Sequence, residues 1–384
     1  MGWIEQYLDY TKETEPKESY HLWTGISVVA ACLQKRVYTR IGVKRVYPNL
    51  YIVLVGESGK TRKTTAMELG EDLLQELEVP LCPDSISGRQ AFTHFLRSKR
   101  VAKKENINGI GEVTTHSLTA FAKELRVLLR GDVDFMADLT DLYDADRKWE
   151  YYTILRELDS VPWAFFNLLG ATAPDWIRTM IPKEAMGGGF TSRIIFVVEH
   201  SKKLTEPDLH LNWRKREELL GGLREIQKLN GQVDETRGFK EAFRPWYIES
   251  DKQIMAGNPP IEGSKFAGYC SRRALFIKKL SIIASASRGG GLALEREDFE
   301  WALGRLVGVE EKMSQAFAGQ GSSLLAELLY RVVSTIRDEK RISQAELLRR
   351  YMYDMDIMQL RNVEESLVRQ KIITREVEGT EIFY

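Results

Sequence analysis

The sequence predicts an α/β fold: a three-layer αβα core with a mostly parallel sheet, then a helical lid and a smaller C-terminal domain. Three observations predict it. Short, near-continuous apolar runs at 51–55, 161–169 and 194–198 are typical of buried parallel strands. Segments with apolar residues at helical spacing lie between these runs. The stretch 51–77 is predicted to form a strand, a glycine-containing turn and a helix, which is the arrangement of a phosphate-binding loop.

The composition sets the broad class. A chain of 384 residues with 43% apolar and 29% charged residues is typical of a globular protein with two or three domains. The formal net charge is zero, so contact with nucleic acid would need a local basic patch. The three cysteines, Cys32, Cys82 and Cys270, have neither disulfide nor metal-site spacing and suit a reducing cytosol. Because no signal peptide or membrane-length apolar run is seen, we expect a cytoplasmic protein without a membrane partner.

The predicted domains follow in order. Residues 1–35 should form two helices, 2–11 and 19–35, the second capped by Ser19. Residues 36–205 should form the α/β core, which begins with a strand at 37–43. Residues 206–320 are predicted to be helical, with long helices at 269–284 and 295–313. Residues 321–384 should form three helices (324–337, 343–351 and 356–370) and a terminal hairpin, an order typical of a winged helix.

The central motif is the loop after strand 51–55. It lacks the strict G-x-x-x-x-G-K-[ST] spacing. Two registers are open, with either Lys60-Thr61 or Lys63-Thr64 as the phosphate-binding pair. The second is preferred because it leaves Gly56 and Gly59 in the turn and starts the helix at Thr64. Lys63 would then bind the phosphates of ATP, and the Thr64 hydroxyl would bind Mg²⁺. The nucleotide-binding residues expected here are Gly56, Glu57, Ser58, Gly59, Thr61, Arg62, Lys63, Thr64 and Thr65.

A second nucleotide strand should end near Glu124, a candidate general base. The preceding residue is Lys123, where an aspartate that holds Mg²⁺ is usual, so the metal ligand is open. Three aspartates on the following helix, Asp138, Asp141 and Asp144, are alternatives.

Strands at 149–155 and 161–169 should form a hairpin around Arg156, and the second should end at Thr172, which could contact the γ-phosphate or the attacking water. The densest basic run, residues 97–104, is predicted to be a helix end and loop. It is either a solvated surface or a contact for the phosphate backbone of nucleic acid through Lys99 and Arg100. Arg193 follows Gly187-Gly-Gly189 and precedes the strand 194–198.

With these motifs in this order, residues 15–320 resemble AAA+ ATPases, and among them replicative helicases of the minichromosome-maintenance and virus-encoded primase-helicase type. The resemblance implies a role for each motif, as follows: Lys63-Thr64 as Walker A, Glu124 as the Walker B glutamate, Thr172 as sensor 1, Arg193 as an arginine finger acting on a neighbouring subunit, Arg272 as sensor 2, and the hairpin at Arg156 as a DNA-facing channel hairpin.

The resemblance implies an ATP- and Mg²⁺-dependent DNA helicase or translocase, which forms a homo-oligomer, expected to be a hexameric ring, on single-stranded or forked DNA. One alternative is a loader or remodeller of a replication protein without unwinding activity. Another is a DNA-binding initiator or regulator whose phosphate loop is catalytically inactive.

Overall fold

The computed structural model describes residues 2–104, 112–144, 148–153, 157–180, 189–206 and 211–317, and, further along, 332–333, 335–337, 339, 341–351, 357–369, 371–378 and 381–384. The chain divides into two compact units, Met1–Ala316 and Phe317–Tyr384.

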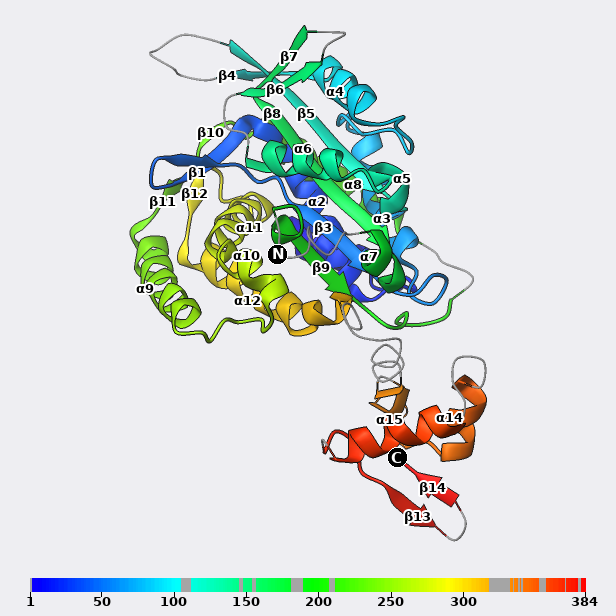
Figure 1. The fold of residues 1–384 in the computed structure, drawn as a ribbon. Coiled ribbons are helices and arrows are strands. Elements are labelled where there is room, and N and C mark those ends of the chain that lie inside the picture. Colours follow the sequence, from blue (N-terminus) through cyan, green and yellow to red (C-terminus); the bar gives the residue numbers. More distant parts are fainter. Residues whose placement is uncertain are drawn as a thin grey trace. The chain divides into compact units, whose positions relative to one another are not determined.

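The larger unit is built on a mixed, mostly parallel sheet (Figure 1). Among the described residues it has five strands in the order β4-β5-β8-β3-β9. Strands β5, β8, β3 and β9 are parallel, and β4 is an antiparallel edge strand. The α/β class expected from the apolar runs is therefore confirmed. Their bounds are β3 Tyr51–Val55, β4 Arg100–Lys104, β5 Glu112–Ala122, β8 Ala164–Thr172 and β9 Ile194–Val198.

Helices cover both faces of this sheet. On β8, the Asn167 amide donates to the Ser27 hydroxyl at 3.0 Å, which places α2 (Glu18–Leu33) on one face. The neighbouring Phe166 packs against Phe92 of α4 (Arg89–Ser98), with ring centroids 5.0 Å apart. Because consecutive strand residues point to opposite faces, α2 and α4 lie on opposite sides of the sheet.

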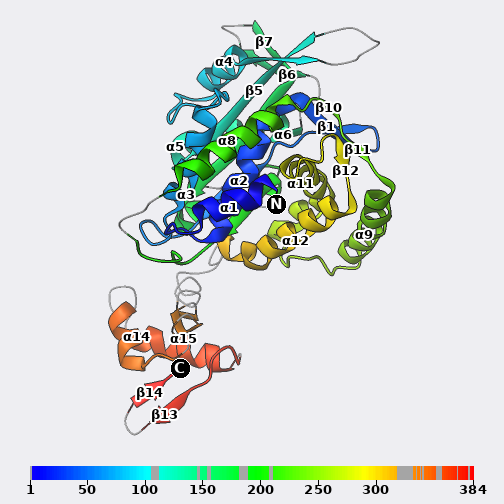
Figure 2. The same cartoon turned by 180° about the vertical axis from the view of Figure 1, so that it is seen from behind.

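The N-terminal helices are part of this unit. Nearly every residue of α2 is buried, as expected of a helix that is apolar on all sides. The helix begins at Glu18, so Ser19 is not its cap; its hydroxyl instead donates to Glu199 at 2.8 Å. Outside α2 lie α1 (Trp3–Thr11) and α8 (Trp213–Lys228), joined by a 2.9 Å hydrogen bond from the Trp3 indole to the Leu219 carbonyl (Figure 2).

The region after β9 is mostly helical. It contains α9 (Arg237–Met255), α10 (Ala267–Cys270), α11 (Arg273–Ser287) and α12 (Arg296–Met313). The predicted helix at 269–284 is divided between α10 and α11, with Arg272 at the junction.

The expectation of an all-helical region is wrong in detail. Short strands β10 (Gly231–Gln232) and β11 (Asp234–Glu235) pair with β1 (Val37–Ile41) and β12 (Ala293–Leu294). The antiparallel strand β2 (Lys44–Val46) completes the sheet of β10 and β1. Two-residue strands are fixed by a distant partner, so local sequence does not show them.

Two predictions about hairpins also need correction. The expected partner strands 149–155 and 161–169 do not pair, because β8 belongs to the central sheet. The hairpin is formed by β6 (Lys148–Thr153) and β7 (Glu157–Pro162). Arg156 lies outside the described residues. The basic run after α4 forms the edge strand β4 instead of a loop, because it finds hydrogen-bonding partners along β5.

The smaller unit has its own core. Helices α14 (Gln344–Tyr351) and α15 (Ile357–Arg369) precede an antiparallel pair, β13 (Glu376–Glu378) and β14 (Glu381–Phe383). The Ser343 backbone also forms a bridge with Phe383. The buried side chains of this core are Val332, Ile336, Ile342, Leu347, Tyr351, Leu360, Val363, Leu367, Ile373 and Tyr384.

Candidate phosphate site and a separate arginine cluster

Three of the predicted site residues lie along one edge of the sheet. Parallel pairing places Val55 of β3 level with Thr172 of β8, and the Gly56 amide donates to the Thr172 carbonyl at 3.2 Å. Ala122 of β5 is level with Gly170, so Glu124 follows β5 at the same edge. The loop after Val55, Thr172 and Glu124 therefore meet at the carboxyl ends of parallel strands, where open α/β sheets bind their ligands.

The loop conformation depends on two residues with positive φ. Gly59 has φ +73°, and Arg62 has φ +56° immediately before α3 (Lys63–Gln75). The helix thus starts one residue earlier than the expected Thr64. Gly56 has no room for a side chain, because a Cβ there would lie 2.6 Å from both the Tyr20 hydroxyl and the Thr61 hydroxyl. The turn brings the unpaired first-turn amides of α3 to the loop.

The two candidate lysines have different surroundings. The Lys63 ammonium lies inside the loop, where it donates to the Gly56 carbonyl at 2.5 Å and lies 3.4 Å from the Glu57 carbonyl. Lys63 is only 9% exposed. Burial lowers the pKa of Lys63, while the nearby carboxylates of Glu124 and Glu57 oppose that shift. In contrast, the Lys60 side chain is 67% exposed and pairs with the Glu57 carboxylate at the surface.

The other loop residues differ in exposure. Thr61 is buried and its hydroxyl donates to the Glu57 carbonyl at 3.1 Å. Thr64 is exposed at the start of α3, and Thr65 is half-buried. Glu57, Ser58 and Gly59 are exposed. Solvent therefore reaches the face of the loop that the first-turn amides and Thr64 share.

Three residues around the loop, Glu15, Lys202 and Tyr20, were not identified from the sequence. Arg62 pairs with Glu15 at 2.7 Å, and Glu15 also pairs with Lys202 at 2.6 Å. The Tyr20 hydroxyl donates to the Val55 carbonyl at 2.7 Å. These residues come from segments far from 51–65 in the sequence. The only local signal for any of them is that Lys202 follows a buried strand.

A pocket of about 220 Å³ lies next to the loop, between α2, β9 and α12. Its walls include the apolar Leu22 and Val198, and Gly304 and Gly308 of α12. Glu199 borders both the pocket and the end of β3 that leads into the loop. Its carboxylate accepts from Lys312 at 3.0 Å, and its amide donates to the Val55 carbonyl at 3.0 Å.

The residues at Lys123 and Glu124 have different surroundings. The Lys123 ammonium turns to helix α3, 3.1 Å from the Glu71 carboxylate and 3.6 Å from that of Glu68. Glu124 is exposed. Thr172 is 3% exposed, and its hydroxyl is 3.3 Å from the Ala173 carbonyl.

The three aspartates considered as metal ligands are placed elsewhere. They lie on α6 (Val133–Asp144), where Asp138 accepts from Arg89 through both oxygens, at 2.7 and 2.9 Å, and Asp144 pairs with Arg193. Asp141 is exposed on the same helix. Searching the described ranges reveals no cluster of three or more His, Cys, Asp or Glu side chains that could hold a metal ion.

Arg193 is at the opposite end of the sheet. It ends a short 3₁₀ helix, Thr191–Arg193, at the amino end of β9, whereas the phosphate loop follows the carboxyl end of β3. Five strand residues separate these ends by about 16 Å. Arg193 is 7% exposed; its Nε lies 3.0 Å from Asp144 Oδ2 and its Nη1 donates to the Gly189 carbonyl at 2.5 Å.

Arg272 joins this cluster. Its pKa is lowered by burial and by the positive charge of Arg193, while Asp144 opposes the shift. Its Nε is buried and has no hydrogen-bond partner in the described part of the chain. Lys279 belongs to the same cluster. Its ammonium donates to the Asn49 carbonyl at 2.8 Å, and burial lowers the pKa of Lys279 to about 7. The structure thus groups Arg193 with Arg272, away from the chain's own phosphate loop.

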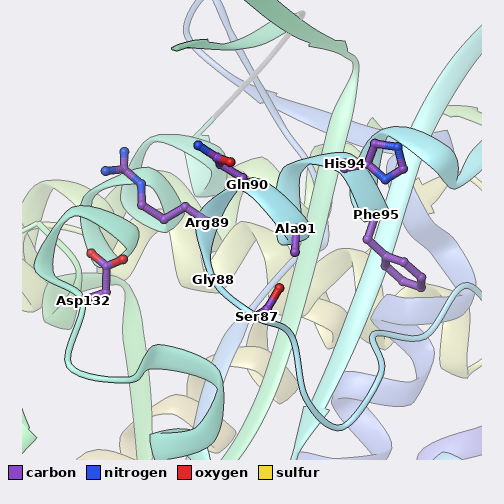
Figure 3. A pocket seen from close by; sticks show the side chains of 8 residues that line it. All are labelled: Ser87, Gly88, Arg89, Gln90, Ala91, His94, Phe95 and Asp132. Atoms are coloured by element: carbon purple, nitrogen blue, oxygen red, sulfur yellow. The ribbon is translucent and has the colours of Figure 1, made fainter. Parts of the chain in front are cut away.

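Two of the predicted nucleic-acid contacts lie at the end of α4. Lys99 is half-buried with its ammonium 4.5 Å from the Phe95 ring centre, and Arg100 is exposed on β4. A groove of about 630 Å³ lies along the start of α4 (Figure 3). Figure 3 shows Arg89 and Asp132 toward one end of the groove and His94 and Phe95 toward the other.

No protein-family model matches the chain, and no curated protein matches it significantly. In the described part of the chain, no helix combines the length and the apolar character that crossing a membrane requires.

Proposed function

We propose that this protein binds and hydrolyses ATP at the loop 56–65 and works as a ring-forming DNA helicase or translocase of the AAA+ type. The observation that carries the proposal is the enclosed Lys63 ammonium, at the sheet edge that also presents Thr172 and Glu124. Among the described residues, the Lys63 ammonium is within hydrogen-bond distance of carbonyl oxygens and the Thr61 hydroxyl but of no carboxylate, so it can receive an anion, and the first turn of α3 adds backbone donors.

The residues suggest a division of labour in hydrolysis. Lys63 would exchange the Gly56 carbonyl for phosphate oxygens, and the α3 amides would orient the same phosphates. Glu124, which is exposed and close enough to act on the Lys63 charge, would accept a hydrogen bond from the attacking water. Thr172 would hold that water or the γ-phosphate from the adjacent strand end.

The donors present fit a Mg²⁺ ion that is held mainly by the nucleotide. Mg²⁺ commonly binds through one or two protein oxygens, substrate phosphates and water. Thr64 offers an exposed hydroxyl, and the positive charge of Lys123 is paired with Glu71. Bound Mg²⁺ would supply positive charge that offsets the charge developing on the phosphates.

The adenine ring of ATP would lie in the pocket between α2, β9 and α12. The pocket adjoins the loop through Glu199, and its lining combines apolar side chains such as Trp23 and Val309 with charged and polar ones. Nucleotide sites are typically apolar with a few fixed polar groups, and Ser19, Glu199 and Lys312 supply such groups here.

The position of Arg193 supports a ring-forming assembly. It lies at the end of the sheet opposite its own loop and so cannot complete its own site. In a head-to-tail assembly, the Arg193 edge of one copy would face the loop of the next. Such interfaces form a ring when the rotation between copies closes, and we propose a hexamer. An arginine supplied in this way can contribute about 10³–10⁵-fold in rate. Arg272 would enter the same interface.

DNA would be held by cations on the hairpins and on the C-terminal unit. We assign Lys99, Arg100 and Arg156 to contacts with phosphates of single-stranded or forked DNA. The C-terminal unit, with α14, α15 and the β13–β14 hairpin, would be a winged helix.

One observation favours a second candidate. Lys123 stands where a metal-binding aspartate is usual in this type of ATPase, and it pairs with Glu71. A DNA-binding regulator that binds nucleotide without hydrolysis would tolerate this substitution. A loader or remodeller of a replication protein would keep hydrolysis but lack unwinding.

One set of assays separates these functions. We would measure the ATPase rate with and without single-stranded DNA, and the unwinding of a forked duplex. A helicase shows DNA-stimulated ATPase and unwinding, and a loader shows ATPase alone. A regulator binds nucleotide but shows neither activity. Failure to bind ATP at millimolar concentration would refute the proposal.

A further inference from the structure

We propose that Asp144 is a positioning residue that aims Arg193 at the nucleotide of a neighbouring subunit. This inference rests on the proposed function. It concerns a carboxylate that lies far from the chain's own phosphate loop and has no role in binding nucleotide there. Asp144 is the last residue of α6, and Arg193 directly precedes β9.

The contacts define how the guanidinium is held. Arg193 Nε and Nη2 both donate to Oδ2 of Asp144, and Nη1 donates to the Gly189 carbonyl. These three bonds use three of the five N–H groups of an arginine. One N–H on each terminal nitrogen is left without a partner among the described residues. Arg193 therefore keeps a pair of donors, which is the arrangement that binds two phosphate oxygens.

The backbone that carries Asp144 is held by Tyr143, while the Asp144 side chain is 47% exposed. The Tyr143 ring is buried and packs edge-on against Tyr51 with centroids 4.8 Å apart. The Tyr143 carbonyl accepts from the Asn49 amide at 3.1 Å. Asn49 lies just before β3, the strand that leads to the phosphate loop, so the end of α6 is tied to the base of that strand. This fixed backbone places the Asp144 carboxylate beside the Arg193 guanidinium that it binds.

The charge balance also favours an arriving anion. Arg193, Arg272 and Lys279 approach the same end of α6, where Asp144 is the one carboxylate among the described residues that the cluster's contacts involve. The carbonyl end of α6 offsets part of this positive charge. The Arg272 Nε is buried and has no hydrogen-bond partner among the described residues, so one donor of this cluster is free to bind an anion. A phosphate from a neighbouring copy would supply the missing negative charge.

The test is the substitution Asp144→Asn in the full-length chain, with Asp141→Asn as the matched control. Asp141 lies on the same helix and is exposed. Asn keeps the shape of the side chain but removes its charge, which weakens the hydrogen bonds that Arg193 donates to it. Misdirecting a catalytic group can cost about 100-fold. We expect kcat for ATP hydrolysis to fall by about 10- to 100-fold, with nucleotide affinity within about threefold of wild type. Asp144→Glu should recover part of the rate, and Asp141→Asn should leave it unchanged.

Mixed assemblies distinguish a positioning role from a structural one. Asp144→Asn chains mixed with Lys63→Ala chains should recover activity, because some interfaces pair an intact loop with an intact Asp144–Arg193 unit. Asp144→Asn mixed with Arg193→Ala should not recover, because both changes damage the same side of the interface. Recovery in the second mixture, or a drop in nucleotide affinity equal to the drop in kcat, would overturn the proposal.

Failure of the inference and failure of the proposed function give different results. A wild-type chain without ATPase activity would refute both. An active wild type with an unaltered Asp144→Asn variant would refute the inference alone. Thermal unfolding of each variant checks that it is folded. If Asp144→Asn is unfolded and Asp144→Glu is folded but inactive, Asp144 has a structural role and the proposal is overturned.

Discussion

Replacing Lys63 by alanine tests the phosphate site most directly. In the free protein the Lys63 ammonium donates to the Gly56 carbonyl at 2.5 Å and lies 3.4 Å from the Glu57 carbonyl. With ATP bound, these neutral acceptors would be exchanged for phosphate oxygens. A hydrogen bond in which one partner is charged contributes about 1.5–3 kcal/mol, and the Lys63 ammonium is charged with either set of acceptors.

The expected loss follows from this exchange. Two bonds that move from the lower end of this range with carbonyls to its upper end with phosphates gain up to about 3 kcal/mol of transition-state stabilisation, or up to roughly 150-fold in kcat/KM. Lys60→Ala is the matched control, three residues away in the same loop. Its side chain is 67% exposed and makes one surface ion pair with Glu57, which contributes no more than about 1 kcal/mol.

Steady-state ATPase kinetics and equilibrium binding of a fluorescent ATP analogue would measure both variants. Lys63→Ala should lose activity and affinity while Lys60→Ala stays within about fivefold of wild type. The opposite ranking would place the phosphates against Lys60-Thr61. Equal, small effects would refute a phosphate site in this loop. The thermal unfolding midpoints should be compared, because Lys63 is buried and its removal leaves loop carbonyls without their donor.

Four further predictions follow from the structure. Arg193→Ala should lower kcat by about 10³-fold or more with nucleotide affinity within a few-fold, and activity should return on mixing with loop-defective chains; no return would argue for a structural Arg193. A chain ending at Gln320 should keep assembly and ATPase activity, since residues up to Ala316 form their own compact unit, and sedimentation would reveal any lost ring. Arg100→Ala and Lys99→Ala should each reduce the salt slope of DNA binding by about one, and an unchanged slope would place that residue off the DNA. Burial lowers the pKa of His21 to about 3, so between about pH 6.5 and pH 3 the unfolded chain binds a proton at His21 that the folded chain does not. As the pH falls through this range, the free energy of unfolding should therefore decrease by up to about 1.4 kcal/mol per pH unit. His21→Gln should remove this contribution in urea titrations.

The sequence alone determined the parts that depend on local pattern. Continuous apolar runs identified the strands β3 and β9, because strands covered on both faces have no polar side. Helical spacing predicted 295–313 for α12 (Arg296–Met313) and 356–370 for α15 (Ile357–Arg369), within one residue at each end. The glycine-containing turn before Lys63 was recognisable because positive φ and close approach restrict which residues can form it.

The tertiary structure decided what lies beside what. The choice of Lys63 over Lys60 as the enclosed lysine depends on the path of the turn, which spacing left open. The edge strand β4 and the strand pair β10–β1 depend on hydrogen bonds to distant partners. Asp144, expected as a possible metal ligand, proved to bind Arg193 at the far end of the sheet. A carboxylate's role depends on which cation lies within hydrogen-bond distance, and that distance is set by packing between segments that the sequence keeps 49 residues apart.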